Sequence, residues 1–104
     1  MLTTLVQFRV AQPVTPAQAR TMFLESAPKY RAVPGLERKY YLLSEDGLRV
    51  GGVYLWRTRA DAERLFDAAW HARLTAKYGS APEITWFATP VVVDNLAGTV
   101  IDAA

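Results

Sequence analysis

Few side chains in this sequence could do chemistry, and Arg73 is the most unusual of them. We expect a helix from Thr58 to about Tyr78, and Arg73 falls on its apolar face with Ala69 and Trp70. A cation in that position either runs along the core until it reaches solvent at the helix end, or holds an anionic or phenolate oxygen in a pocket. The sequence leaves both interpretations open.

Other side chains are placed to line the same pocket. Ser26 and Tyr30 lie on the apolar face of a first helix, and Tyr54 and Trp56 lie on a strand. These residues could simply pack the core, or their rings and donors could bind a flat, apolar ligand. The predicted substrate-binding residues are Arg73, Tyr54, Trp56, Trp70, Ser26 and Tyr30.

Several kinds of chemistry find no support in the sequence. His71 is the only histidine, and the helical wheel places it on the outer face, which argues against a histidine base or haem ligand. The chain has no cysteine, no carboxylate cluster with metal-ligand spacing, and no phosphate-binding or dinucleotide motif. We therefore expect no metal and no cofactor, and no residue stands out as the general base.

The elements that must position these residues follow from periodicity and capping signals. Thr15, Pro16 and Gln18 form a helix start, and Pro28 should end or kink that helix. The order of elements is strand, helix, strand, strand, helix, strand, which is typical of an α+β ferredoxin-like plait with a four-stranded antiparallel sheet and two helices on one face. The expected strands are 3–10, 36–44, 50–57 and 83–88, with an extended segment at 91–93.

Glycines mark two special backbone positions. Pro34-Gly35 predicts a tight turn in which Gly35 adopts a positive φ. Gly51-Gly52 lies inside a strand and indicates either a bulge or the close approach of another backbone or a ligand.

Both faces of the second and third expected strands are apolar. Leu36, Tyr40 and Leu42 alternate with Tyr41 and Leu43, and Tyr54 and Trp56 alternate with Val53 and Leu55. The helices can cover only one face of the sheet, so we expect a second copy of the chain to cover the other, in a homodimer. The apolar segment from Val91 to Ile101 should reach across to that partner.

Composition bounds the remaining possibilities. The 104 residues predict one domain, 1–104, with 12 basic and 10 acidic residues and a net charge of +2. No basic block or recognition motif points to nucleic acid, no apolar run is long enough to span a membrane, and the first residues do not read as a secretory signal. A cytoplasmic location is expected.

Six segments together resemble one known family. They are Val33-Pro34-Gly35-Leu36, Lys39-Tyr40-Tyr41-Leu42, Ser44-Glu45, Gly51-Gly52-Val53-Tyr54-Leu55-Trp56, Ala72-Arg73-Leu74 and Pro90-Val91-Val92-Val93-Asp94-Asn95. This pattern is similar to that of the YdhR-like family of monooxygenases, which belongs to the dimeric α/β-barrel superfamily with the antibiotic-biosynthesis monooxygenases. The resemblance implies two ferredoxin-like subunits packed sheet to sheet, with a pocket between sheet and helices in each.

Two functions remain at this stage. The first is a cofactor-independent monooxygenase that acts on a small aromatic or polyketide-like substrate, which would itself reduce oxygen once deprotonated. The second is a non-catalytic dimeric barrel that binds a small apolar ligand or serves a stress-related role.

Overall fold

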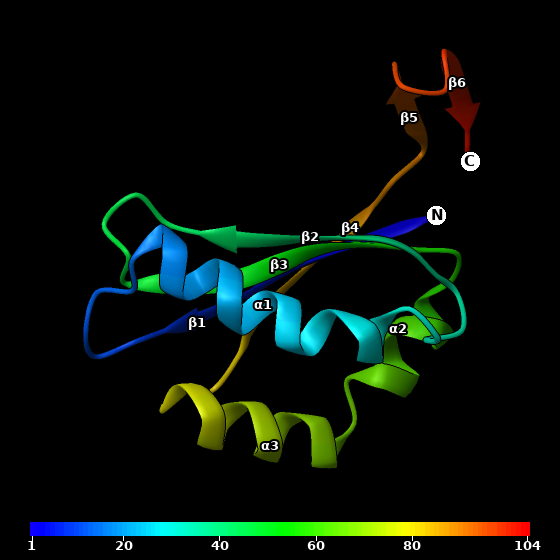
Figure 1. Ribbon diagram of the computed structural model, residues 1–104. Coiled ribbons are helices and arrows are strands. Elements are labelled where there is room, and N and C mark those ends of the chain that lie inside the picture. Colours follow the sequence, from blue (N-terminus) through cyan, green and yellow to red (C-terminus); the bar gives the residue numbers. More distant parts are fainter.

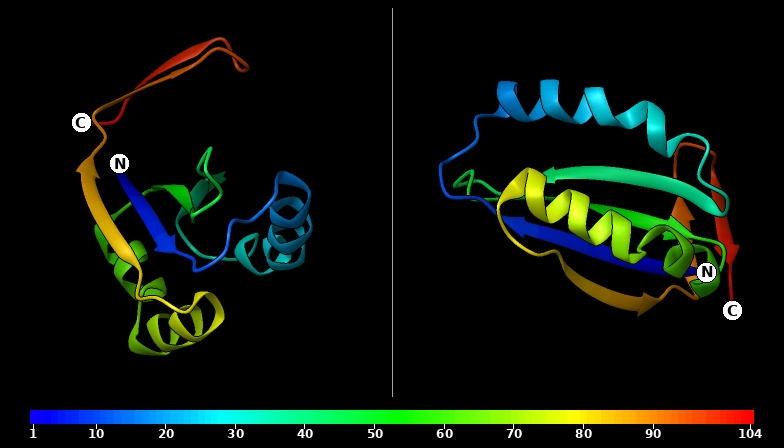
Figure 2. Two further views of the ribbon diagram at one scale, coloured as in Figure 1. Left: turned by 90° about the vertical axis from the view of Figure 1, so that its left-hand side faces the viewer. Right: turned by 90° about the horizontal axis from the view of Figure 1, so that it is seen from below.

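The computed structural model describes all 104 residues and contains one main sheet with helices on a single face (Figures 1 and 2). The sheet is antiparallel throughout, in the order β2-β3-β1-β4. This confirms the expected α+β ferredoxin-like plait. The elements are β1 (Leu2–Arg9), α1 (Pro16–Tyr30), β2 (Leu36–Leu43), β3 (Arg49–Trp56), α2 (Arg59–Leu65), α3 (Ala68–Tyr78), β4 (Glu83–Ala88), β5 (Val91–Asp94) and β6 (Thr99–Asp102).

The first helix begins as its sequence indicates but runs further. The Thr15 hydroxyl accepts the Gln18 N–H, and the Gln18 side chain accepts the Thr15 N–H, which completes a capping box. Pro28, which was expected to end or kink the helix, does not end it, because α1 continues to Tyr30. Pro28 lies on the exposed side of the last turn, where its missing N–H removes only one helical hydrogen bond.

The single helix expected from Thr58 to Tyr78 is two helices. Phe66 turns the chain out of α2 with φ −81° and ψ 48°, and the Asp67 carboxylate then caps α3 by accepting the Trp70 N–H at 2.8 Å. The break lets the Phe66 ring enter the core, 4.7 Å from the Trp70 ring between centroids. The break also changes which side of the second helical segment faces the sheet. Trp70 and Leu74 face the sheet, whereas Ala69 and Arg73 are exposed.

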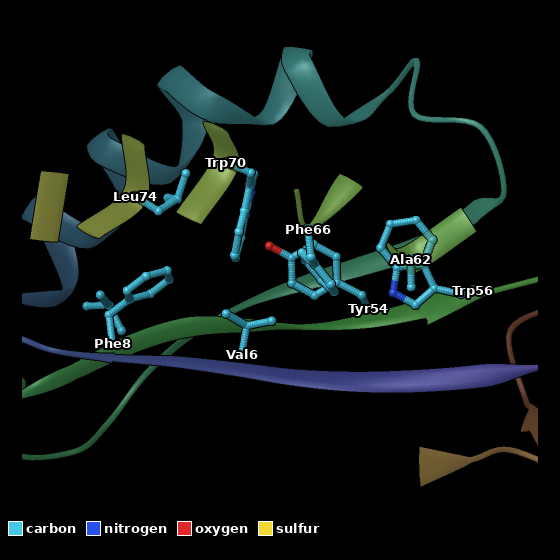
Figure 3. Close-up of a cluster of buried hydrophobic side chains, with 9 residues drawn as sticks. Val6, Phe8, Tyr54, Trp56, Ala62, Phe66, Trp70 and Leu74 are labelled. Atoms are coloured by element: carbon cyan, nitrogen blue, oxygen red, sulfur yellow. The ribbon is translucent and has the colours of Figure 1, made fainter. Parts of the chain in front are cut away.

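Aromatic rings fill most of the space between sheet and helices (Figure 3). Trp56 is completely buried, and its indole N–H donates to the hydroxyl of Thr4, also completely buried, at 3.0 Å. The Tyr54 and Trp56 rings lie parallel, and the Phe66 ring stands edge-on to both. The core residues are Val6, Phe8, Val50, Tyr54, Trp56, Ala62, Phe66, Trp70 and Leu74.

A bulge near the start of β2 decides which side chains face the helices. Leu36 pairs with Trp56 and Arg38 pairs with Leu55, so Glu37 is an extra residue in the strand. Leu36 therefore packs against the core and does not share the outer face with Tyr40, as simple alternation suggested. Past the bulge, Arg38 belongs to the outer face and Lys39 to the inner one.

The two special glycine positions are confirmed. Gly35 has a φ of +78°, as the turn before β2 requires. Gly51 lies in regular pairing without a bulge, and a Cβ there would come within 1.8 Å of the Val6 carbonyl oxygen. Close approach of β1 is therefore the reason for glycine at this position.

The C-terminal residues form a small hairpin that stands away from the sheet, on the side opposite the helices (Figure 1). The base of the hairpin is hydrogen-bonded to Met1, the residue before β1. The N-terminal ammonium donates to the Ala103 carbonyl at 3.1 Å, and the Met1 carbonyl accepts the Thr89 N–H at 3.0 Å. Leu96 at its tip is 94% exposed. None of the helices has both the length and the apolar character needed to cross a membrane.

Candidate functional site

A cavity of about 310 Å³ lies between the inner face of the sheet and the helices α1 and α3. Four tyrosines supply much of its wall: Tyr30 from α1, Tyr41 from β2, Tyr54 from β3 and Tyr78 from α3. Small or aliphatic side chains, four basic side chains and the ring of Phe8 supply the rest. The cavity therefore offers flat, weakly polar surfaces of the kind that suit a planar ligand.

Lys39 is the central polar residue of this cavity. Its Nζ lies 3.2 Å from the centre of the Tyr30 ring, 3.9 Å from that of Tyr41 and 4.7 Å from that of Tyr54. It shares this face with Tyr41, and it pairs across the sheet with Tyr54. Gly52, next along β3 on the same face, leaves room for the lysine stem, because a Cβ there would meet Lys39 Cε at 3.2 Å.

The surroundings of Lys39 disfavour its charged form. Burial, and to a smaller extent repulsion from the Lys77 ammonium, together lower the pKa of Lys39 to about 7. No aspartate or glutamate lines the cavity, and Lys39 has no ion pair. At neutral pH a large fraction of Lys39 is therefore a free amine, which can accept a proton.

Three tyrosine hydroxyls of the cavity wall, those of Tyr41, Tyr54 and Tyr78, stay protonated. Burial is the main reason that the pKa of Tyr54 is raised far above its ordinary value and that of Tyr78 is raised to about 12. The pKa of Tyr41 is also raised by burial, although its hydrogen bond with Ser26 at 2.7 Å opposes the rise. These groups can donate hydrogen bonds to a ligand.

The structure brings together four of the six predicted site residues. Ser26, Tyr30 and Tyr54 line the cavity, and Arg73 lines it from an exposed position. The two tryptophans, Trp56 and Trp70, are buried and do not line the cavity. The indole of Trp70 supports the wall indirectly, because its N–H donates to the Tyr30 hydroxyl at 3.3 Å.

His71 also lies outside the cavity. It is half-buried, with its ring edge-on to that of Trp70 and 5.2 Å away between centroids. No three histidine, aspartate or glutamate side chains gather where they could hold a metal ion.

Sequence reasoning missed Lys39 as a site residue. Its signal was present, since Lys39 stands two residues before Tyr41 and so shares its face of the strand. The charge alone suggested a solvated side chain, and only the packed helices show that this face is covered.

A second hollow, of about 540 Å³, lies on the other face of the sheet, where the C-terminal hairpin overhangs it. Its walls include Tyr40, Val53 and Leu55 from the sheet and Val93 and Leu96 from the hairpin region. Arg38 pairs with Asp94 at 2.5 Å and so links the sheet to the hairpin.

Comparison with solved structures gives the fold an independent context. A monooxygenase from the gene ActVA-Orf6 of Streptomyces coelicolor, solved in complex with Nanaomycin D, matches with a TM-score of 0.66 and 19% identity, over 88% of this chain and 89% of that one. SnoaB, a cofactor-independent oxygenase from Streptomyces nogalater, matches with a TM-score of 0.61 and 22% identity, over 85% and 91% of the two chains. The chain has the fold of these two oxygenases.

The same fold also occurs in a protein of another bacterium, Rv0793 from Mycobacterium tuberculosis, with a TM-score of 0.59 and 17% identity over 85% of this chain and 93% of that one. No family model matches the sequence, and no curated protein matches it. At these identities the likeness is one of fold.

Proposed function

We propose that the protein is a cofactor-independent monooxygenase acting on a small aromatic or polyketide-like substrate. The observation that carries the proposal is Lys39, an amine with a pKa of about 7 enclosed by tyrosine rings in the sheet–helix cavity. It supplies the general base that this chemistry needs and that the sequence alone did not reveal. The shared fold with two oxygenases supports the same reaction class.

The reaction begins with a proton transfer. The neutral amine of Lys39 takes a proton from the acidic C–H or O–H of an anthrone or hydroxyaromatic substrate. The ammonium that forms then stabilises the delocalised anion, while the tyrosine rings around it stabilise the ammonium. Base and counter-ion are thus the same side chain in its two protonation states.

The substrate anion is the reductant of molecular oxygen. For an anthrone, the ring CH₂ becomes C=O, so one oxygen atom enters the product and the other leaves as water. The substrate supplies all four electrons. The hydroxyls of Tyr54 and Tyr78, held protonated by their raised pKa values, donate hydrogen bonds to oxygen atoms that gain charge.

We also propose membership of the YdhR-like family and a homodimer joined through the outer sheet faces. The outer face carries Tyr40, Leu42 and Phe87, which are 55%, 39% and 50% exposed in the single chain. The overhanging hairpin adds further exposed apolar side chains, including Val93. A second copy would remove both surfaces from water.

Oxygen consumption tests the proposed activity. The purified protein, without added metal or cofactor, is mixed with a panel of anthrones and dihydroxyaromatics in an oxygen-electrode cell. Turnover should rise with pH through about 7 and fall at least tenfold in Lys39→Met. The control is Arg20→Met, which removes an exposed cation from the outer side of α1.

Two results would contradict the proposal. Turnover that persists in Lys39→Met would remove Lys39 from the mechanism. Binding of the same compounds, detected by quenching of tryptophan fluorescence, with no oxygen uptake would favour the non-catalytic ligand-binding barrel.

A further inference from the structure

The charged residues of the chain are distributed unevenly around the cavity. Its lining holds four of the twelve basic residues and none of the ten acidic ones: Lys29, Lys39, Arg73 and Lys77. All three lysines of the protein are among them. Elsewhere, five of the eight other basic residues form ion pairs with carboxylates, whereas none of these four does. The cavity is therefore a region of uncompensated positive charge.

Three of the four cations stand where the cavity opens to solvent. Lys29, Arg73 and Lys77 are exposed, yet each lines the cavity. Lys29 comes from the last turn of α1, and Arg73 and Lys77 lie one turn apart on α3. The two helices thus present cations to the mouth of one cavity, and both cover the same face of the sheet (Figure 2).

Keeping these charges together has a cost that no carboxylate of the cavity lining offsets. The pKa of Lys39 is lowered partly by Lys77, so the positive charge at the cavity mouth acts on Lys39 in the interior. A ligand that carries a negative group at the mouth would supply the missing counter-charge. Arginine and lysine donors in this arrangement suit a carboxylate, which accepts several hydrogen bonds at once.

We propose that the cavity binds an aromatic carboxylic acid, with its rings against Tyr30, Tyr41 and Tyr54 and its carboxylate at the mouth between Lys29, Arg73 and Lys77. This deepens the proposed function by naming the substrate class. Turnover of the acid depends on the proposed oxygenase function, whereas binding of the acid does not. The phenolic or C–H acid end of the molecule points inward to Lys39, and the carboxylate remains at the solvent edge.

A matched pair of probes tests the proposal by binding alone. The probes are 6-hydroxy-2-naphthoate, whose hydroxyl and carboxylate lie at opposite ends of the ring system, and 2-naphthol, which lacks the carboxylate. Binding is measured by isothermal titration calorimetry at pH 7. In 20 mM salt the acid should bind at least tenfold more tightly than the naphthol. This advantage should shrink to less than threefold in 0.5 M salt, because the mouth is exposed to solvent and its charges are screened.

Variants then locate the carboxylate. Arg73→Met and Lys77→Met should each weaken binding of the acid three- to tenfold and change binding of the naphthol less than twofold. The control Arg20→Met, exposed on α1, should change neither. Thermal melting of each variant shows that the fold is retained, as expected for exposed side chains.

Three results would overturn the inference. They are equal affinity for the two probes, an advantage of the acid that salt leaves unchanged, and loss of the acid's advantage in Lys39→Met but in neither mouth variant. The last would place the carboxylate inside the cavity. Selective binding of the acid without oxygen uptake would uphold this inference and refute the oxygenase proposal, so the two can fail separately.

Discussion

Replacing Lys39 by methionine should stabilise the protein, and the gain should depend on pH. The lysine has a pKa of about 7 in the folded chain, against an ordinary value of 10.5. Below pH 7 both the folded and the unfolded chain hold the proton, so folding carries the full cost of burying an ammonium. Methionine replaces the apolar stem of the side chain and removes that cost, at the expense of the proposed base.

The magnitude follows from proton linkage. Between pH 7 and 10.5 the folded chain has released the proton and the unfolded chain still holds it, so the free energy of unfolding of the wild type rises with pH. The slope approaches about 1.4 kcal/mol per pH unit, and the integrated rise between pH 6 and pH 9 is about 2.5 kcal/mol. Lys39→Met lacks this contribution, so its advantage over the wild type should shrink by that amount across the range.

Urea unfolding of both proteins at pH 6, 7, 8 and 9 measures the effect. Taking the difference between wild type and variant cancels the contributions that the two proteins share. Lys77→Met is the companion variant, because removing the neighbouring ammonium should raise the pKa of Lys39 and move the rise to higher pH. A wild-type-minus-variant difference that stays constant from pH 6 to 9 would refute the assignment of a lowered pKa to Lys39.

Three further outcomes are expected. Thr4→Val removes the hydroxyl that accepts the Trp56 indole N–H, so the buried N–H is left without a partner. The free energy of unfolding, measured with denaturant, should fall by about 1–3 kcal/mol; an unchanged midpoint would contradict the importance of this bond. Gly51→Ala forces a methyl group against a β1 carbonyl and should cost more than about 2 kcal/mol. Gly79→Ala, which meets no neighbour but has a φ of +78°, should cost only about 1 kcal/mol; equal losses would contradict the close-approach argument. Leu42→Asp on the outer sheet face should convert a dimer of roughly twice 11.6 kDa to a monomer in light scattering, whereas Leu24→Asp, on the exposed side of α1, should not; a wild-type monomer would contradict the proposed interface.

Local signals account for the parts of the fold that were predicted correctly. The capping box at Thr15 depends on residues within three positions of one another, and the turn at Gly35 depends on a two-residue conformational preference. Alternation over eight residues predicts each long strand in the same way. Interactions of this range leave their mark in a single short stretch of sequence.

The errors arose where a distant contact outweighed the local pattern. A helix through Phe66 is locally reasonable, yet burying that ring against Trp56 and Trp70 favours the break that Asp67 then caps. This break also moved Arg73 from the expected buried face to the exposed edge of the cavity. The helical wheel assumed one continuous helix, and packing of the core does not permit that helix.

By itself, the sequence determined the order of the four main strands and the helical segments between them. It also determined that both faces of β2 and β3 are apolar and that cysteine chemistry is absent, because these features depend on residue type and period. Only the tertiary structure decided that Lys39 faces a covered cavity. That outcome required Tyr54 to lie opposite it in the sheet and Tyr30 to pack above it from a helix. The pKa of a lysine is set by the solvent and charges around it, and those are known only when the chain has folded over them.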